Sequence, residues 1–382
     1  MKFPKLTVAA LSLLSDFLSA RTWTDVKGRT LEAEMVSKSE SSVTVLVRGQ
    51  KTEIALEMLS ESDQKFVKNW ERGDVAGYEA LFEQKWPKLV SIDLDIEITE
   101  EEGEDGSYIY RSPHYEFISN TELSKVPVKR FSVLFEATRE YVRQLPYANK
   151  KAHQESVRYQ VFLFDTMESY VRAGGPEGSA GVYLGGKDVI MVLCQSLGLV
   201  KRGSTWAMDY DRTNKTLPHE ITHQLTDREY FVEGARGWFS EGFAEYVAVT
   251  PYRSGKFSVS KAPSYIEEYV TSFSRVDNRG RNLGEEILAP RLEKFMTMSY
   301  SDFASAENGN FNYGLGALLV TYFNHYDGEG DAANIKNFLR AIKQGKTGTE
   351  ALEVLRAGRS WEQLEEDVTT GWRKRGVKID FM

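Results

Sequence analysis

The segment His219-Glu220-Ile221-Thr222-His223 constrains this chain more than any other feature. Two histidines four positions apart lie on one face of an α-helix, one turn apart, so both imidazoles can bind the same metal ion. Zinc–nitrogen bonds are about 2.0–2.1 Å long, which suits this spacing. Glu220 is rotated about 100° around the helix from His219, where it is a candidate general base for a metal-bound water. The alternative is two surface histidines beside a solvated glutamate.

The residues around this segment favour a helix. Thr216 can cap it, and Pro218 is tolerated in a first turn. Leu217, Ile221 and Leu225 form an apolar stripe on the side away from the two histidines. We therefore expect a helix that is buried on one side and carries the metal ligands on the other.

A third ligand is expected within the segment Trp238–Tyr246, W-F-S-E-G-F-A-E-Y. A catalytic zinc takes three protein ligands and keeps a fourth position for water. Glu241 is the best candidate, because the 17 residues between it and His223 allow a helix end, a loop and a returning helix. Glu245 lies on the same face and is expected to accept the free N–H of a zinc-bound histidine. The small Gly242 indicates close packing on the first helix; the alternative is two acids on a solvated helix face.

The pattern His219-Glu220…His223, then Trp238…Glu241-Gly242-Phe243-Ala244-Glu245-Tyr246, resembles the gluzincin metallopeptidases, which include thermolysin and the aminopeptidase N family. It is similar in particular to an uncharacterised group of bacterial peptidase-MA-like proteins that share W-x-S-E-G-x-A-E-Y and a helical C-terminal region. The likeness runs from about residue 112 to the end.

This resemblance implies an α+β, zincin-like (thermolysin-type) domain over residues 111–382, mostly helical in its C-terminal half. It implies one Zn2+ as cofactor, bound by His219, His223 and Glu241, with Glu220 activating water. It also implies that Tyr313 stabilises the oxyanion, because Tyr313–Ala317 fits the aminopeptidase phrase Tyr-x-x-Gly-Ala. A core tyrosine at the start of a helix is the alternative for Tyr313.

One departure from the aminopeptidases concerns the substrate. Their G-A-M-E-N phrase, which holds the free amine of a substrate, is absent. The run Val189–Leu193 lies upstream of the zinc helix, where these folds place the edge strand that pairs with an extended peptide, and it contains no glutamate. The expected activity is therefore that of an endopeptidase.

Residues 21–72 read as a separate small β-domain. Three strand-like runs are separated by Ser- and Gly-containing turns, and a short helix with Ser60 as N-cap and Asp63 three residues later follows. Together with Trp23 and the apolar face Phe66, Val67 and Trp70, this stretch resembles the first homology domain of the Sla endocytic adaptor. The resemblance implies an SH3-like barrel with a peptide or protein ligand. The three runs are Leu31–Val36, Val43–Val47 and Thr52–Leu56.

The rest of the chain alternates between connectors, strands and helices. Residues 73–110 read as a linker, and their acidic run from Glu100 to Asp105 is typical of a solvated loop. The later patterns predict strands at His114–Ser119, Val157–Phe164 and Val189–Leu193 and a helix within Glu122–Leu145. They also predict a helix carrying Ile335, Phe338, Leu339 and Ile342 that stops at Gly345.

The N-terminus and the composition bear on location and partners. Lys2 and Lys5, an apolar stretch and Ser19-Ala20 predict a cleavable signal peptide over residues 1–20, hence a secreted or periplasmic protein; an ordinary N-terminal helix is the alternative. The formal net charge of -8 argues against nucleic acid as a partner. No internal apolar run is long enough to span a bilayer. The single cysteine, Cys194, excludes an intrachain disulfide and is expected to be a buried hydrophobe.

The function predicted from the sequence is zinc-dependent hydrolysis of peptide bonds in a peptide or protein substrate. The rival is a catalytically silent, zinc-stabilised scaffold, or a binding protein that works through the N-terminal barrel. A scaffold needs no base at Glu220, so the intact motif favours the enzyme.

Overall fold

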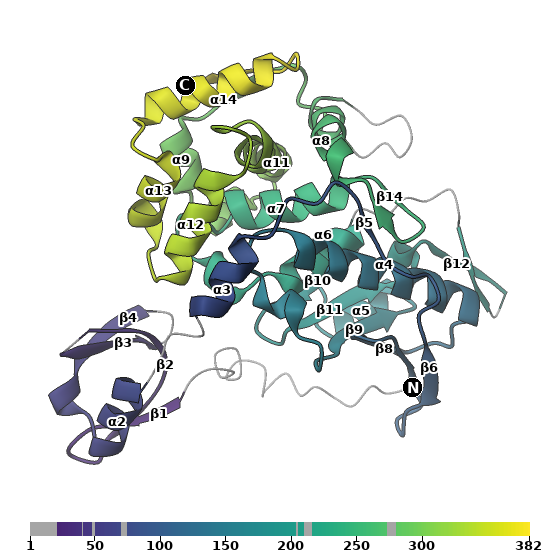
Figure 1. Cartoon of the computed structure of the whole chain (residues 1–382). Coiled ribbons are helices and arrows are strands. Elements are labelled where there is room, and N and C mark those ends of the chain that lie inside the picture. Colours follow the sequence, from purple (N-terminus) through teal and green to yellow (C-terminus); the bar gives the residue numbers. More distant parts are fainter. Residues whose placement is uncertain are drawn as a thin grey trace. The chain divides into compact units, whose positions relative to one another are not determined.

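The computed structural model describes residues 21–39, 41–47, 50–69, 75–203, 205–209, 216–272 and 280–382. The described chain forms two compact units (Figure 1), one ending at Ala80 and the other beginning at Leu81. The predicted signal peptide, residues 1–20, and Trp70 lie outside the described residues.

The smaller unit is a four-stranded antiparallel sheet in the order β1-β2-β3-β4, followed by a helix. Trp23, Val43, Val45 and Val67 are buried in its core. The three predicted strands and the helix are confirmed, whereas β1 was not expected from its four residues. The elements are β1 (Arg21–Thr24), β2 (Thr30–Lys38), β3 (Ser42–Val47), β4 (Gln50–Ala55), η1 (Leu56–Met58) and α2 (Glu61–Asn69).

The start of α2 is capped by Ser60, as the sequence predicts. The backbone N–H of Asp63 donates to Oγ of Ser60 at 3.2 Å. The carboxylate of Asp63 accepts from the backbone N–H of Thr24 at 2.7 Å, so it ties the helix start to β1.

The larger unit begins with a six-stranded mixed sheet in the order β10-β11-β9-β8-β7-β6. The pairs β8–β9 and β9–β11 are parallel, and the other pairs are antiparallel. The three strands predicted from the sequence are confirmed as β8, β9 and β11. The six strands are β6 (Thr99–Glu102), β7 (Tyr108–Arg111), β8 (Tyr115–Ser119), β9 (Tyr159–Phe164), β10 (Gly181–Leu184) and β11 (Val189–Leu193).

Part of the segment expected as a linker belongs to this unit. Strand β5 (Val90–Ser91) pairs with β15 (Lys256–Phe257), and β6 and β7 extend the large sheet. The acidic run is solvated as predicted, but Glu100–Glu102 lie in β6 at the sheet edge, with all side chains exposed. Charges are a common feature of edge strands, and they remove the apolar alternation by which a strand is recognised in a sequence.

The edge strand next to the helix with the two histidines is β10, which corrects the expectation for Val189–Leu193. That run forms β11, whose five residues are all buried and which lies between β10 and β9. The chain turns back after Leu184, with Asp188 at φ 56°, and places β10 outside β11. A fully apolar run is what a strand buried on both faces requires.

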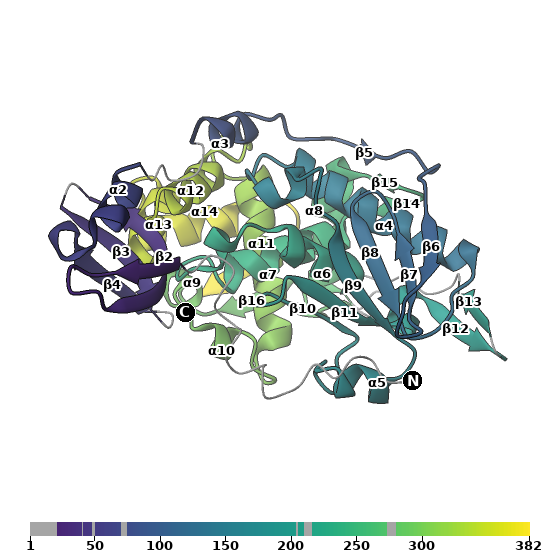
Figure 2. The ribbon, with the colours of Figure 1, turned by 90° about the horizontal axis from the view of Figure 1, so that it is seen from below.

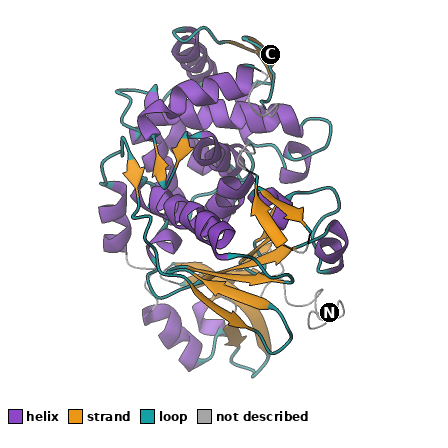
Figure 3. Ribbon diagram, turned by 90° about the vertical axis from the view of Figure 1, so that its right-hand side faces the viewer, coloured by secondary structure: helices purple, strands orange, loops and turns teal. Residues whose placement is uncertain are grey.

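Helices α4 (Lys125–Gln144) and α6 (Thr216–Leu225) contact one another, and both contact the sheet, so they cover the same face of it (Figure 2). Most of the remaining described chain is helical, as the purple ribbons of Figure 3 show beside the orange strands. The four apolar residues of the predicted late helix are buried in α12, and Gly345 follows its end at φ 97°. The helices are α3 (Val75–Phe82), α5 (Met167–Arg172), α7 (Trp238–Val249), α8 (Ala262–Thr271), α9 (Leu292–Met296), α10 (Tyr300–Phe303), α11 (Gly309–His325), α12 (Ala333–Lys343), α13 (Gly348–Arg356) and α14 (Trp361–Arg373).

Short elements complete the larger unit. The hairpins β12–β13 and β14–β15 are antiparallel, and β16 pairs in parallel with β17 near the C-terminus. Their bounds are β12 (Leu199–Arg202), β13 (Thr205–Met208), β14 (Tyr252–Arg253), β16 (Glu286–Ala289) and β17 (Lys378–Phe381), and the 3-10 helices are η2 (Lys150–His153), η3 (Cys194–Leu197), η4 (Arg228–Phe231) and η5 (Val259–Lys261).

Helix α7 packs most closely on α11, which corrects the expectation that Gly242 serves contact with the first zinc helix. A Cβ atom on Gly242 would lie 2.6 Å from the carbonyl carbon of Gly316 in α11. The two glycines therefore let the helix that carries Glu241 lie against the helix that carries Tyr313.

The described residues form an α+β protein with a helical C-terminal half, as predicted. Among them, no helix is both long and apolar enough to cross a membrane. Cys194 is buried, as expected, and burial raises the pKa of its thiol to about 12.

Candidate metal centre

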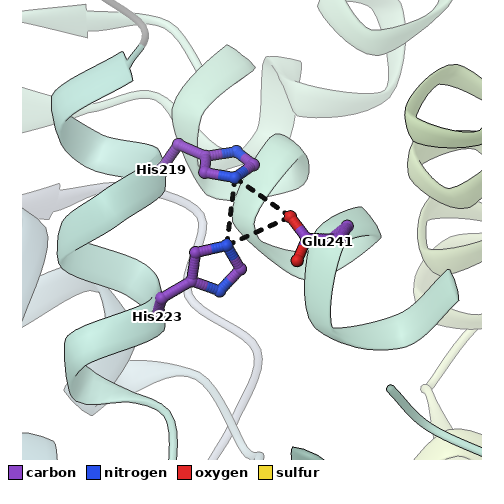
Figure 4. Close-up of side chains that lie close together, drawn as sticks. All are labelled: His219, His223 and Glu241. Atoms are coloured by element: carbon purple, nitrogen blue, oxygen red, sulfur yellow. Dashed lines mark hydrogen bonds and ion pairs between the residues drawn. The ribbon is translucent and has the colours of Figure 1, made fainter. Parts of the chain in front are cut away.

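Helix α6 presents the two histidines because its other side is apolar. Leu217, Ile221 and Leu225 are buried, which confirms the stripe predicted from the sequence. The helix contacts α4, α7, β10 and β11. His219 and His223 consequently project toward α7 (Figure 4).

Three side-chain atoms converge between α6 and α7 (Figure 4). Nε2 of His219 and Nε2 of His223 are 3.0 Å apart. Oε2 of Glu241 lies 3.2 Å from the first nitrogen and 3.1 Å from the second. The side chains of His219, His223 and Glu241 are only 12%, 10% and 4% exposed, so little water screens the group. No second cluster of this kind is found in the part of the chain that the structure describes.

The spacing of these atoms is compatible with one zinc ion. Tetrahedral bonds of 2.0–2.1 Å place neighbouring ligand atoms about 3.3–3.4 Å apart, and the three measured separations are 3.0–3.2 Å. Two imidazole nitrogens and one carboxylate oxygen are also a donor set that zinc accepts in catalytic sites. His219, His223 and Glu241 could therefore hold a metal.

Glu245 lies behind His219, where the sequence predicts it. Its Oε1 is 3.0 Å from Nδ1 of His219, so it can fix the ring tautomer that turns Nε2 toward the cluster. The guanidinium of Arg281 is 3.1 Å from the same carboxylate oxygen. This arginine, which no sequence motif marked, also lies over the ring of Tyr313 at 5.1 Å.

Glu220 is held by the edge of the sheet. Its Oε2 accepts a hydrogen bond from the backbone N–H of Tyr183 in β10 at 2.8 Å. The strand is itself anchored, since the hydroxyl of Tyr183 donates to Asp188 at 2.8 Å and Lys151 pairs with Asp188 at 2.6 Å. The candidate base therefore has a defined position between α6 and the sheet edge.

Two tyrosines reach the cluster, and the sequence indicated only one of them. The ring of Tyr313 stacks beside that of His219, with centroids 6.0 Å apart. Tyr300 was missed, and its hydroxyl donates to Oε1 of Glu241 at 3.1 Å. No motif surrounds Tyr300, and 59 residues separate it from Glu241, so only the packing of α10 reveals it.

The electrostatics favour a cation. Burial opposes ionisation of Glu241, but the two histidines outweigh it and hold the pKa of this carboxyl well below its usual range. Burial likewise raises the pKa of Glu245, yet Arg281 and His219 bring it down to about 2. Burial would lower the pKa of His219, but Glu241 and Glu245 raise it to about 10. Two buried carboxylates thus stay charged at neutral pH beside the imidazoles.

Burial also sets the direction in which the pKa values of the two tyrosine hydroxyls shift. It is the largest cause that raises the pKa of Tyr313 and of Tyr300, and the nearby Glu241 carboxylate adds to it. Both hydroxyls consequently keep their protons at neutral pH and can act only as neutral donors or acceptors.

Comparison with models of known protein families found no match. Comparison with curated proteins found no match either.

Proposed function

We propose that this chain is a zinc metallopeptidase of the gluzincin type, with the peptidase MA-like, thermolysin-type zincin fold in its larger unit. The convergence of His219, His223 and Glu241 beside Glu220 carries the proposal. Residues from two helices and a sheet edge meet there with the donor set and spacing of a three-ligand zinc site. A structural zinc site is usually closed by four protein ligands, whereas three leave a position for chemistry.

His219, His223 and Glu241 would hold the metal. A zinc ion bound there would supply Lewis acidity, which polarises a carbonyl and lowers the pKa of a water toward ~7. Glu245 keeps His219 in the required tautomer, since its carboxylate accepts from Nδ1 at 3.0 Å. Arg281 balances the charge of Glu245 at 3.1 Å.

Glu220 would take the proton from the attacking water and deliver it to the leaving amine. An ionised carboxylate is an acceptor only, so it can receive this proton without rearrangement. The hydrogen bond from the N–H of Tyr183 occupies Oε2 and leaves Oε1 for the water. The sheet edge therefore sets the orientation of the base.

Tyr313 is the better candidate for the oxyanion donor. The hydroxyl of Tyr300 donates its one proton to Oε1 of Glu241 and so has none left for an oxyanion. The Tyr313 ring lies beside His219, and its raised pKa keeps the hydroxyl protonated. A protonated phenol next to the metal ligands can donate to the oxygen that becomes negative in the transition state.

The edge strand β10 would bind the substrate backbone. In its pairing with β11 the N–H of Leu193 donates to the carbonyl of Ala180, and alternate residues of an antiparallel edge point outward. The outward positions are therefore Gly181 and Tyr183. The N–H of Tyr183 is taken by Glu220, so the groups open to a peptide are the carbonyl of Tyr183 and both backbone groups of Gly181. An extended peptide could add to this edge as a further strand. Such an arrangement holds the chain on both sides of a bond, which suits an endopeptidase.

Two further parts of the proposal concern the N-terminal region. We propose that the four-stranded unit is an SH3-like barrel of the Sla-type homology domain that binds a peptide or protein ligand. We also propose that the chain is secreted or periplasmic, following cleavage near Ala20.

The alternative function is a catalytically silent, zinc-stabilised scaffold that acts through the four-stranded N-terminal unit. The carboxylate of Glu220 favours the enzyme over the scaffold, because a scaffold does not require an oriented base.

The decisive experiment compares Glu220→Gln with the wild type for zinc content and for cleavage of casein-derived peptides. Glu220→Gln should retain one zinc per chain, because Glu220 is not a ligand, and should cleave about 10²–10⁴ times more slowly. Glu168→Gln, whose side chain is 80% exposed on α5, is the matched control and should behave as the wild type.

The results of this experiment distinguish the peptidase from the scaffold. Cleavage by Glu220→Gln at the wild-type rate would refute the mechanism. Stoichiometric zinc in the wild type without cleavage of any peptide in the mixture would favour the scaffold.

A further inference from the structure

Arg236 is an exposed arginine beside the metal cluster, and no carboxylate of the described residues pairs with it. Arg236 immediately precedes Gly237, the N-cap of α7, and its side chain is exposed. Its guanidinium carbon lies 4.5 Å above the centre of the Tyr300 ring. The hydroxyl of Tyr300 in turn donates to Glu241. One aromatic ring therefore separates Arg236 from a metal ligand.

Two other charged side chains near the cluster already have partners. Arg281 is paired with Glu245 at 3.1 Å, and Glu220 accepts from the backbone of Tyr183. Within the described ranges no carboxylate oxygen comes within 4.0 Å of Arg236, whose contact there is the Tyr300 ring. A guanidinium carries five N–H groups, so one that lies over a ring keeps several of them available to a carboxylate.

The contact with the Tyr300 ring also lowers the entropy that Arg236 loses when it binds an anion. A free arginine loses rotamer entropy when it pairs with an anion, but one already stacked on a ring has lost part of it. A bidentate pair with a carboxylate adds direction as well as energy. The charge matters too, since an acidic substrate must otherwise approach the negative carboxylate of Glu220.

We propose that Arg236 selects peptides with an aspartate or glutamate close to the scissile bond, by binding that side chain in its guanidinium plane. The inference rests on the proposed peptidase function and names its substrate class. An extended peptide advances about 3.3 Å per residue, so a site one aromatic ring from a metal ligand is within reach of the first or second residue from the cleaved bond.

The test uses the zinc-loaded full chain and a peptide mixture made from a digested bacterial lysate. Wild-type cleavage sites should be enriched in Asp and Glu at one fixed position within two residues of the bond. Arg236→Gln should lose that enrichment and keep the preferences at other positions. Arg236→Glu should replace it with Lys and Arg. Arg172→Gln, which removes a 68% exposed arginine from α5, is the matched control and should cleave as the wild type.

A second arm measures kinetics on one cleaved sequence synthesised with Glu or with Gln at that position. The wild type should prefer Glu by about tenfold or more in kcat/KM, as a charged hydrogen bond implies. Arg236→Gln should bring the ratio close to one. An equal loss on both peptides would overturn the proposal, because it would mean that Arg236 only supports Tyr300. Acidic enrichment that survives in Arg236→Gln would overturn it as well.

A binding arm separates failure of this inference from failure of the proposed function. The probes are two fluorescein-labelled pools of degenerate hexapeptides that differ only in a fixed Glu or Gln. Glu220→Gln should bind the Glu pool more tightly, and the double variant with Arg236→Gln should bind both pools alike. Absence of cleavage by every form would reject the peptidase, whereas equal binding of the two pools by Glu220→Gln would reject the role of Arg236.

Discussion

The hydroxyl of Tyr300 donates to Oε1 of Glu241 at 3.1 Å, while Oε2 of the same carboxylate faces both imidazole rings at 3.1–3.2 Å. Both oxygens of the buried group are thus occupied by different partners. Rotation of the carboxylate would break the hydrogen bond to Tyr300, so the phenol holds Oε2 in the position that faces both imidazoles.

Replacing Tyr300 with phenylalanine should therefore weaken zinc binding. Outer partners of metal ligands typically contribute 10–100-fold in affinity, and we expect a loss of about that size in competition with a chromogenic chelator. Tyr265→Phe, at a tyrosine that is 45% exposed on α8, should leave the affinity unchanged. Unchanged zinc affinity in Tyr300→Phe would show that the hydrogen bond does not orient Glu241.

Removal of zinc should lower the stability of the wild type and have no effect once a ligand is lost. A ligand present at 100 times its Kd stabilises the folded state by about 2.7 kcal/mol. Chelator should lower the thermal midpoint of the wild type in a way that depends on zinc concentration. His223→Ala should unfold at one temperature with or without zinc. A zinc-dependent midpoint in His223→Ala would mean that the metal binds elsewhere.

Gly242→Ala should destabilise the larger unit. The added Cβ would lie 2.6 Å from the carbonyl carbon of Gly316 and 2.9 Å from Cγ2 of Val320, so α7 and α11 would have to move apart. Overpacking of this kind costs about 1–3 kcal/mol, occasionally more, and urea unfolding would measure it. Gly309→Ala is the control, because its nearest contact would be 3.7 Å away; it should not destabilise. Equal stability of the two variants would contradict the close packing.

The stability of the larger unit should fall in acid through His325. Burial lowers the pKa of this side chain from 6.5 to about 4, and its Nε2 lies 2.9 Å from the hydroxyl of Tyr246. The folded state thus favours the neutral ring, so the contribution is complete above pH 6.5 and is lost as the pH falls toward 4. At 1.36 kcal/mol per pKa unit the loss amounts to about 3 kcal/mol.

The measurement compares His325→Gln with the wild type in urea at several pH values. The free energy of unfolding should decline less steeply between pH 6.5 and 4 in the variant, because one proton fewer is taken up on unfolding. Parallel curves for the two proteins would exclude His325 as a source of acid lability.

Local pattern was sufficient for several regular elements in each unit. The alternation in Val43–Val47 and the 3.6-residue spacing of Ile335, Phe338 and Ile342 identify a strand and a helix, because each reflects one buried face. Strands β6 and β10 escaped prediction for the opposite reason. Each lies at a sheet edge, where one side of the backbone is unpaired. All four side chains of β6 are exposed, and only one of the four residues of β10 is buried, so neither strand shows the alternation of one buried face.

The sequence by itself determined that His219 and His223 share a helix face and that Glu220 does not, since one helical turn sets these directions. It also pointed to Glu241 and Glu245 through their spacing. Only the tertiary structure decided that Tyr300 reaches Glu241, that Arg281 stands behind Glu245 and that β10 orients Glu220. These contacts join residues between 36 and 59 positions apart. They connect α6 with β10, α7 with α10, and α7 with the segment after α8, so tertiary packing and not any local repeat brings them together.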